Sequence, residues 1–158
     1  MLKIKNNYKG IVIVFFAVIS VYYFYPEKAL PENSTIDKIL VYKAKHEMEV
    51  YSQNKLLKTY KVSLGRGGWG LEGKDWDNKT PVGNFVIDTK FTNSSFHKAL
   101  TISYGNQIEI HGMRNHLGAI GKIHRLIDWT QGCIAVTNDE VDELYIAVPV
   151  NTPIYIRP

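Results

Sequence analysis

Short segments with strand composition recur along this chain, and they constrain its fold more than any other feature. Three of them follow one another closely, at residues 38–43, 47–52 and 56–64, with short polar breaks between them. Segments separated by so few residues pair as neighbouring antiparallel strands. The spacing therefore predicts an antiparallel meander at the start of the folded domain.

Four more runs of this kind follow, at residues 84–91, 100–104, 107–111 and 152–156. One segment has a helical pattern instead. It begins with the capping-box residues Thr137 to Glu140, continues with apolar residues at helical spacing, and ends at Pro149. The sequence therefore predicts a mostly β domain, a sheet sandwich or partly open barrel with one short helix.

The N-terminal region differs in composition from the rest. Residues 11–25 carry no charge, and Lys3, Lys5 and Lys9 precede them. This pattern is typical of an export or anchor segment. We expect residues 1–25 to be a membrane anchor or signal segment, with an uncleaved anchor favoured because no small-residue cleavage site stands out. A buried helix or strand at the start of the domain is the alternative.

The same pattern predicts the location of the remaining residues. Lysines that flank an apolar segment stay on the cytoplasmic side, so the rest of the chain is expected outside the cytoplasm, in the periplasm or on the cell-wall side. Residues 26–35 are polar and contain two prolines, as expected of a tether, and residues 36–158 form the expected domain. A chain of 158 residues has room for one such domain.

Charge excludes one class of partner. Removing the three N-terminal lysines from the 19 Lys and Arg leaves 16 against 15 Asp and Glu. Such a balanced domain has no basic surface for phosphates, so nucleic acid is not expected as a partner.

The reactive side chains gather between residues 111 and 133, which include three histidines and the one cysteine of the chain. A thiol attacks as its thiolate and has a free pKa of about 8.5, so Cys133 needs a base, and His111 at a strand end can supply it. Gly132 allows a tight turn that leaves the sulfur approachable. Nearby backbone N–H groups can then form an oxyanion hole.

Two other interpretations of these residues stay open at this point. Cys133 can be a buried thiol that packs as a small apolar residue. Alternatively, His111, His116, His124 and Cys133 can be zinc ligands, although no pair of them has the short spacing of local zinc sites. We therefore expect no metal.

The sequence around Cys133 is more specific than the pair of Cys133 and His111 itself. The runs IHG at 110–112, AIG at 119–121 and TQGCIAV at 130–136 resemble the catalytic signature of the L,D-transpeptidase (YkuD-type) family. KVSLG at 61–65 and KTPVGNF at 79–85 resemble other recurring sequence motifs of that family. The resemblance extends over roughly residues 36–157, which is the whole expected domain.

The resemblance implies a function for several residues. Cys133 would be the nucleophile and His111 the general base, with the Gly112 carbonyl orienting the imidazole. Thr130 takes the Ser/Thr position of the motif and Gly132 the glycine on the oxyanion side. The implied substrate is a peptidoglycan stem peptide, which would form an acyl-thioester on the cysteine and be transferred to an amine without any cofactor.

The chain departs from the family pattern at two places. Ala135 stands where the family often has an arginine, and residues 121–129 are an additional stretch between His111 and Cys133. His124 or Arg125 from that stretch can bind substrate instead. A solvated charge pair of Arg125 with Asp128 is the alternative.

A glycine-rich loop at residues 65–78 contains Trp69, which can line a substrate groove or attach the loop to the core. Two rival functions also remain. The same residues can serve a carboxypeptidase or amidase of wall peptides, or the domain can be a wall-binding module without activity.

Overall fold

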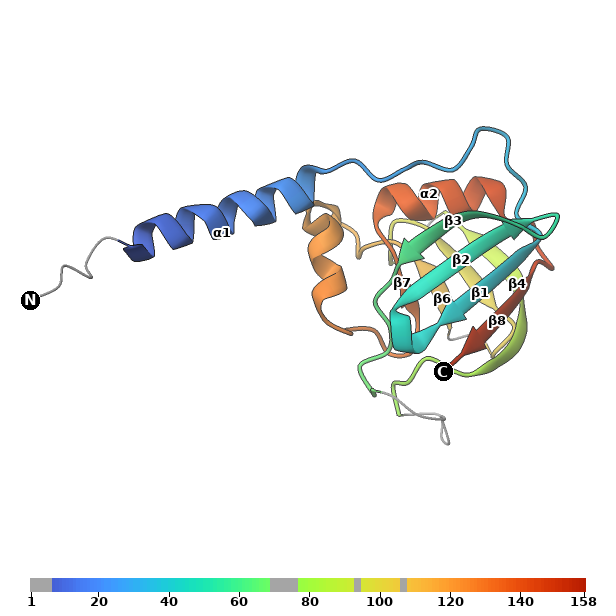
Figure 1. The fold of residues 1–158 in the computed structure, drawn as a ribbon. Helices are drawn as coiled ribbons and strands as arrows, with labels where there is room; N and C mark the ends of the chain where they lie inside the picture. The colour runs from blue at the N-terminus through green and yellow to red at the C-terminus, as the bar shows by residue number, and fades with distance from the viewer. Residues whose placement is uncertain (1–6, 69–76, 93–94, 106–107) are drawn as a thin grey trace, which may run out of the picture.

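A computed structural model describes residues 7–68, 77–92, 95–105 and 108–158 of the chain. Eight strands form one sheet in the order β3-β2-β1-β8-β4-β5-β6-β7 (Figure 1). The first four strands along the chain are β1 (Lys38–Tyr42), β2 (Glu47–Ser52), β3 (Lys55–Lys61) and β4 (Gly83–Phe91). The other four are β5 (Ala99–Ile102), β6 (Glu109–His111), β7 (Ile134–Ala135) and β8 (Pro153–Arg157).

The predicted meander is confirmed, because β1 pairs antiparallel with β2 and β2 with β3. Alternate residues of the strands point inward, as a sheet with one buried face requires. In β1 and β2 these inward residues are Ile39, Val41, Met48 and Val50, all fully buried. Strand β8 then lies parallel to β1 and antiparallel to β4, so the C-terminal strand joins the two halves of the sheet.

The sheet curls until its two ends meet. Beyond β3 the chain continues to Ser63, whose N–H donates to the Ala135 carbonyl at 3.0 Å and whose carbonyl accepts from the Ala135 N–H at 2.8 Å. Ala135 belongs to β7, at the other end of the strand order. The predicted partly open barrel is therefore the observed architecture.

The helix α2 (Asn138–Ala147) begins where the sequence predicts it. The Thr137 hydroxyl accepts from the Glu140 N–H and the Glu140 carboxylate accepts from the Thr137 N–H, which forms the capping box. Val141 and Leu144 are fully buried against the sheet. This helix covers one side of the barrel (Figure 1).

Two short 3₁₀ segments and one strand are absent from the prediction. The segment η1 (Lys43–Lys45) connects β1 to β2, and η2 (Gly118–Leu126) lies in the stretch before Cys133. Gly121 interrupts η2 with a φ of 49°, so no regular helical period runs through it. Strand β7 has two residues, too few for a period of two to be recognised.

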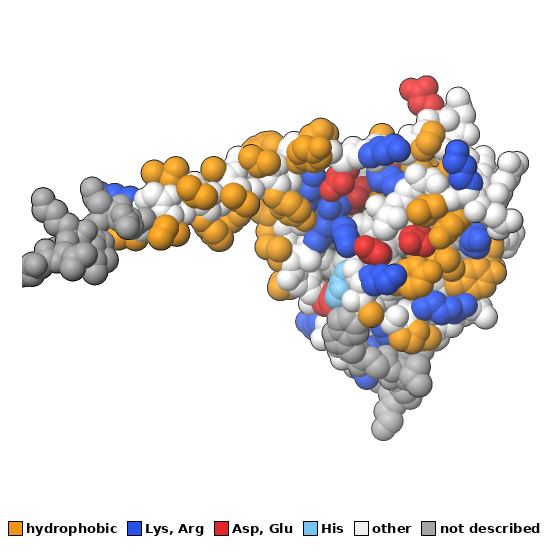
Figure 2. Space-filling model, in the orientation of Figure 1, with side chains coloured by type: hydrophobic (Ala, Val, Ile, Leu, Met, Phe, Trp, Pro, Cys, Tyr) orange, Lys and Arg blue, Asp and Glu red, His pale blue; other side chains and the backbone are white. Residues whose placement is uncertain are grey.

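The N-terminal helix α1 (Asn7–Phe24) projects from the barrel (Figure 1), and its apolar side chains cover the projecting rod in Figure 2. Within the described residues, no helix has both the length and the apolar character needed to cross a membrane. The predicted membrane anchor therefore finds no support. The physical reason is length: α1 opens with polar residues through Lys9, and its uncharged part is shorter than the ~20 residues a span requires.

Residues 26–35 form neither helix nor strand and connect α1 to the barrel. The end of the helix just before this connection is hydrogen-bonded to the rest of the molecule. Tyr23 donates its hydroxyl to the Ala119 carbonyl and the Lys122 ammonium donates to the Tyr25 carbonyl, so the end of α1 lies against η2. The contact brings the N-terminal segment beside the stretch that precedes Cys133.

Candidate active site

Strands β6 and β7 bring His111 and Cys133 together. The two strands are parallel, with Ile110 opposite Ile134 and His111 opposite Ala135. Opposite residues of neighbouring strands share a face, and so do residues two apart on one strand. Cys133 lies two residues before Ala135, so the thiol and the imidazole are diagonal neighbours on one face of the sheet.

The imidazole of His111 is held in one orientation. Its Nδ1 lies 2.6 Å from the carbonyl oxygen of Gly112. A carbonyl can only accept, so Nδ1 carries the hydrogen and the lone pair of the neutral ring is on Nε2. The ring is 1% exposed, and this burial lowers the pKa of His111 to about 4, partly opposed by the hydrogen bond to Gly112. His111 is therefore neutral at pH 7, with Nε2 as its basic atom.

Two aromatic side chains surround this ring. Phe96 stacks on His111 with ring centroids 3.7 Å apart and an angle of 22° between the planes. Trp129 meets it edge-on at 5.7 Å and 69°. These contacts fix the plane of the imidazole and remove water from it. Sequence reasoning missed both residues, since an isolated aromatic has no motif that marks it as a site residue.

Cys133 is partly exposed, and its sulfur lies in a poorly solvated place. The pKa of the Cys133 thiol is raised to about 11, mainly by burial. A backbone hydrogen bond at Glu109 acts to lower this pKa, and the charge of Glu109 acts to raise it. At neutral pH the resting pair is thus a neutral thiol and a neutral imidazole. Cys133 becomes a thiolate only when a base removes its proton.

The turn that presents Cys133 depends on Thr130 and Gly132. The Thr130 hydroxyl donates to the Cys133 carbonyl at 2.7 Å and accepts from the Gly132 N–H at 3.2 Å. Gly132 has a φ of 115°, and a Cβ there would lie 2.8 Å from the Ile108 side chain and 3.0 Å from the Lys79 carbonyl. Backbone conformation and space therefore both require glycine before the cysteine.

Gly112 has a packing role in addition to the hydrogen bond that its carbonyl makes with His111. A Cβ at this residue would lie 2.8 Å from both the Asn138 and the Val141 side chains of α2. The Asn138 side-chain oxygen also accepts from the Met113 N–H at 2.8 Å. Glycine thus lets the start of α2 pack directly on the end of β6, next to His111.

His124 lies in η2 and is 4% exposed. Its Nδ1 lies 3.1 Å from the Ser63 hydroxyl, and its ring meets Trp129 edge-on at 6.4 Å and 89°. Trp129 therefore contacts the rings of both His111 and His124. The pKa of His124 is lowered to about 4, mainly by burial and in smaller part by the charge of Arg125.

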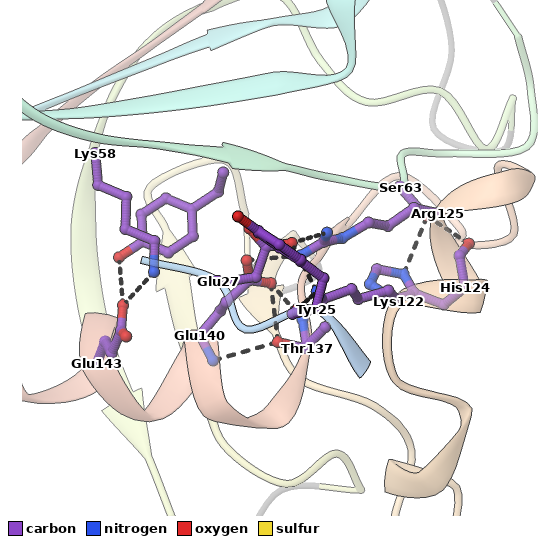
Figure 3. A network of polar contacts seen from close by, with 11 residues as sticks. Tyr25, Glu27, Lys58, Ser63, Lys122, His124, Arg125, Thr137, Glu140 and Glu143 are labelled. Carbon is purple, nitrogen blue, oxygen red and sulfur yellow. Dashed lines mark hydrogen bonds and ion pairs between the residues drawn. The ribbon is translucent and has the colours of Figure 1, made fainter. Parts of the chain in front are cut away.

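Arg125 is occupied by carboxylates of this chain. Its side chain is 7% exposed and lies 2.7 Å from Glu140 of α2 and 2.9 Å from Glu27 of the N-terminal connection (Figure 3). Asp128, the alternative partner suggested by the sequence, pairs with His46 at 3.0 Å. The two ion pairs account for the burial of Arg125 without a substrate.

The remaining candidates are placed as follows. Ala135 is fully buried, His116 is exposed, and Trp69 lies outside the described residues. Within the part of the chain that the structure describes, no three His, Cys, Asp or Glu side chains gather where they could hold a metal ion.

Comparison with known families agrees with this geometry. The model of the YkuD family, described as the L,D-transpeptidase catalytic domain, matches residues 36–156, a range that includes His111, Cys133 and the whole sheet. The chain belongs to the YkuD family. The match begins at the first residue of the predicted domain and ends within β8, so the family domain and the curled barrel coincide.

Several solved structures have a similar fold. An L,D-transpeptidase from Xylanimonas cellulosilytica (residues 123–326) is 16% identical with a TM-score of 0.59, covering 83% of this chain and 65% of that one. The helical cell shape determining protein Pgp2 from Campylobacter jejuni is 20% identical with a TM-score of 0.59, covering 82% and 50%. Bd1075 from Bdellovibrio bacteriovorus is 22% identical with a TM-score of 0.57, covering 82% and 51%.

At these identities the likeness to solved structures shows the fold alone. The chain spans 65% or less of the length of each of these three relatives. No curated protein sequence matches it. The family is thus established for residues 36–156.

Proposed function

We propose that this chain is a peptidoglycan L,D-transpeptidase that uses Cys133 as nucleophile and His111 as base. The observation that carries the proposal is the state of the His111 ring. The Gly112 carbonyl holds its hydrogen on Nδ1, so the free lone pair of Nε2 belongs to the ring that is the diagonal neighbour of Cys133. Because peptidoglycan lies outside the cytoplasmic membrane, the proposed site of action is extracytoplasmic.

The first half of the reaction forms the acyl-enzyme. His111 Nε2 takes the proton of the Cys133 thiol as the sulfur attacks the carbonyl that precedes the terminal D-residue of a stem peptide. The negative charge on the carbonyl oxygen is stabilised by backbone N–H groups near Cys133. Collapse breaks the carbon–nitrogen bond, and His111 returns the proton to the leaving amine. The product is a thioester on Cys133 and a free D-amino acid.

The shifted pKa values disfavour transfer of the thiol proton to His111 before substrate binds. A thiol with a pKa of about 11 stays protonated until substrate arrives, which protects the sulfur from oxidation between turnovers. An imidazolium with a pKa of about 4 is a strong acid, so it gives its proton readily to the leaving amine. The pair therefore acts by proton transfer during attack, and no stable thiolate is needed.

The second half transfers the acyl group. An amine of a second stem peptide attacks the thioester, His111 Nε2 removes its proton, and the thiol of Cys133 leaves with that proton. The product is a cross-link between two stems. Water in place of the amine gives carboxypeptidase trimming through the same steps.

The test uses the full chain with purified muropeptides and reads product masses. Dimers linked through the acyl group are expected, together with a mass increase on Cys133 when a carbapenem, an acylating mimic of the donor, is added. Cys133→Ser should abolish turnover while the circular dichroism spectrum is unchanged, because a hydroxyl is far less acidic than a thiol. Trimmed monomers alone would favour the carboxypeptidase.

His111→Ala and His116→Ala form a matched pair for the base. The first removes the buried imidazole and should lower turnover by at least about 100-fold, the usual contribution of a general base. The second removes an exposed histidine five positions along the chain and should leave turnover unchanged. Normal activity in Cys133→Ser, or a folded protein whose thiol resists both alkylation and the carbapenem, would contradict the proposal.

A further inference from the structure

Strand β6 places the carboxylate of Glu109 beside Cys133. The parallel register of β6 and β7 sets Ile110 opposite Ile134, so one residue earlier Glu109 lies opposite Cys133. Opposite residues of neighbouring strands share a face of the sheet. The two residues also interact, since a backbone hydrogen bond at Glu109 and the charge of its side chain both act on the pKa of the thiol. Cys133 therefore has a carboxylate directly across the ladder and the His111 imidazole diagonal to it.

The Glu109 carboxylate is not used by the fold. Within the part of the chain that the structure describes, it forms no hydrogen bond and no ion pair. Thr101, its neighbour across the ladder in β5, donates its hydroxyl hydrogen to the Thr89 carbonyl at 3.2 Å instead. Glu109 is half-buried, and burial raises the pKa of its carboxyl group. It is thus a partly desolvated acid that solvent still reaches, next to a cysteine that is partly exposed as well.

This carboxylate is unfavourable for the first half of the proposed reaction. The negative charge of Glu109 acts to raise the pKa of the Cys133 thiol, and it opposes the negative charge that develops when the donor is attacked. The second half has the opposite requirement. A side-chain amine has a free pKa of about 10.4, so it arrives at neutral pH as an ammonium, which a neighbouring carboxylate attracts. The charge that hinders acylation therefore suits the acceptor.

We propose that Glu109 binds the ammonium group of the acceptor stem beside the Cys133 thioester and takes the proton that this group must lose before it attacks. The inference rests on the proposed function and adds the recognition of the acceptor. It gives the site a means of selecting an amine over water, because water has no charge for the carboxylate to bind.

The protons of the transfer step balance with this additional group. An ammonium has three hydrogens, and the new amide keeps one of them. One goes to the Glu109 carboxylate before the nitrogen attacks. Another goes to His111 Nε2 during attack and then to the Cys133 sulfur as the carbon–sulfur bond breaks. Glu109 afterwards releases its proton to solvent, and the pair of Cys133 and His111 is neutral again.

Three substitutions separate the charge of Glu109 from its packing. Glu109→Gln has nearly the same shape and removes the charge and the proton acceptor. Glu109→Asp keeps the charge on a shorter side chain. Glu49→Gln is the matched control, because Glu49 is a half-buried carboxylate in β2, which pairs with β1 and β3 and with neither β6 nor β7. Circular dichroism checks that each variant is folded.

The measurement is the ratio of cross-linked to trimmed product, read by mass spectrometry. The full chain is acylated with a tetrapeptide donor and offered a muropeptide with a free side-chain amine. Glu109→Gln should lower the ratio by at least about tenfold through a higher KM for the acceptor, as expected for one lost charge-assisted hydrogen bond. Glu109→Asp should recover part of the loss, and Glu49→Gln should show none. Acylation of Cys133 by a carbapenem should be at least as fast in Glu109→Gln, because the opposing charge is gone.

Hydroxylamine distinguishes recognition of the acceptor from a structural effect. It is uncharged at neutral pH, so it attacks the thioester without needing Glu109, and its rate should be the same in the wild type and in Glu109→Gln. An unchanged product ratio, an equal loss with hydroxylamine, or slower acylation by the donor would each overturn the inference. When the wild-type chain still cross-links, these results leave the proposed function intact. A wild-type chain that is never acylated would overturn both.

Discussion

The two imidazoles of the site are held by different kinds of structure. His111 lies at the end of β6, where backbone pairing with β5 and β7 sets its position and the neighbouring Gly112 carbonyl sets its ring. His124 lies in η2, an interrupted 3₁₀ segment outside the sheet. Side chains hold η2 in place: Ser63 binds His124, and Glu140 and Glu27 bind Arg125 (Figure 3).

The difference separates a region held by backbone pairing from a region held by side chains. A strand ladder repeats the same backbone hydrogen bonds whatever the side chains are, so β6 and β7 tolerate substitutions around them without moving His111 or Cys133. A segment held by a few side chains responds to each of them. We therefore expect substitutions at the contacts of η2 to change stability while the reactivity of Cys133 stays constant.

The largest effect is predicted for Arg125→Met. Methionine keeps most of the apolar side chain but removes the charge, which leaves Glu140, with a side chain 4% exposed, without its cation. Removing one partner of a buried ion pair costs several kcal/mol. The free energy of unfolding of the full chain, measured with urea, should fall by about 3 kcal/mol. This is the lower end of the usual range for a buried ion pair, because Thr137 still donates to Glu140.

Lys61→Met is the matched control. Lys61 lies 2.7 Å from Glu47, the same separation as Arg125 from Glu140, but its side chain is 58% exposed. Exposed ion pairs contribute little, so the loss should be below about 1 kcal/mol. Similar losses for the two variants would show that burial does not distinguish η2 from the surface of the sheet.

A pH dependence tests whether both imidazoles are buried as neutral groups. The pKa values of His111 and His124 are lowered to about 4, whereas the unfolded chain binds these protons near pH 6.5. Between these values the unfolded state holds more protons. The contribution of the two neutral histidines to the free energy of unfolding is therefore fully present above about pH 6.5 and is lost as pH falls toward 4. Each histidine should contribute a slope of up to about 1.4 kcal/mol per pH unit.

Urea unfolding between pH 4.5 and 7.5 gives the slope, and variants assign it. His111→Asn and His124→Asn should each reduce the slope by a similar amount, although one residue is in a strand and the other in η2. His116→Asn controls for the loss of an exposed histidine. A reduction in one variant alone would show that only one of the two regions keeps its imidazole neutral.

Sequence reasoning recovered the fold where local patterns are strong. Strand composition and short polar breaks revealed β1 and β2, and the capping box of Thr137 located the start of α2. It missed β7, which is defined by its partners rather than by its own two residues. It also missed η2, because Gly121 breaks the period. The contact between Glu27 and Arg125 joins residues 98 positions apart, and no local pattern signals such a pair.

The candidate site could be predicted from the sequence only in part. Cys133, His111 and the glycines beside them belong to a recognisable sequence motif. In the structure, β6, which ends at His111, pairs with β7, which begins directly after Cys133. Phe96, Trp129 and Ser63 were missed, since their contribution is to fix the rings of the two histidines. Burial raises the pKa of Cys133 to about 11, and a sequence does not reveal how much solvent reaches a sulfur.

The smallest effect is predicted for Glu27→Gln, which tests whether the N-terminal connection supports η2. Glu27 is 45% exposed and lies 2.9 Å from Arg125 and 3.3 Å from Lys122. Solvent screens such pairs, so the free energy of unfolding should change by less than about 1 kcal/mol, and the change should shrink in high salt.

Hydrogen exchange is the sharper measurement for Glu27→Gln. Exchange in η2 should rise in Glu27→Gln while β6 and β7 keep their protection, because their hydrogen bonds are backbone pairs. Arg125 keeps Glu140 in this variant, which separates it from Arg125→Met. Equal increases in η2 and the two strands would show that the N-terminal connection stabilises the barrel as a whole, and the contrast between the regions would be wrong.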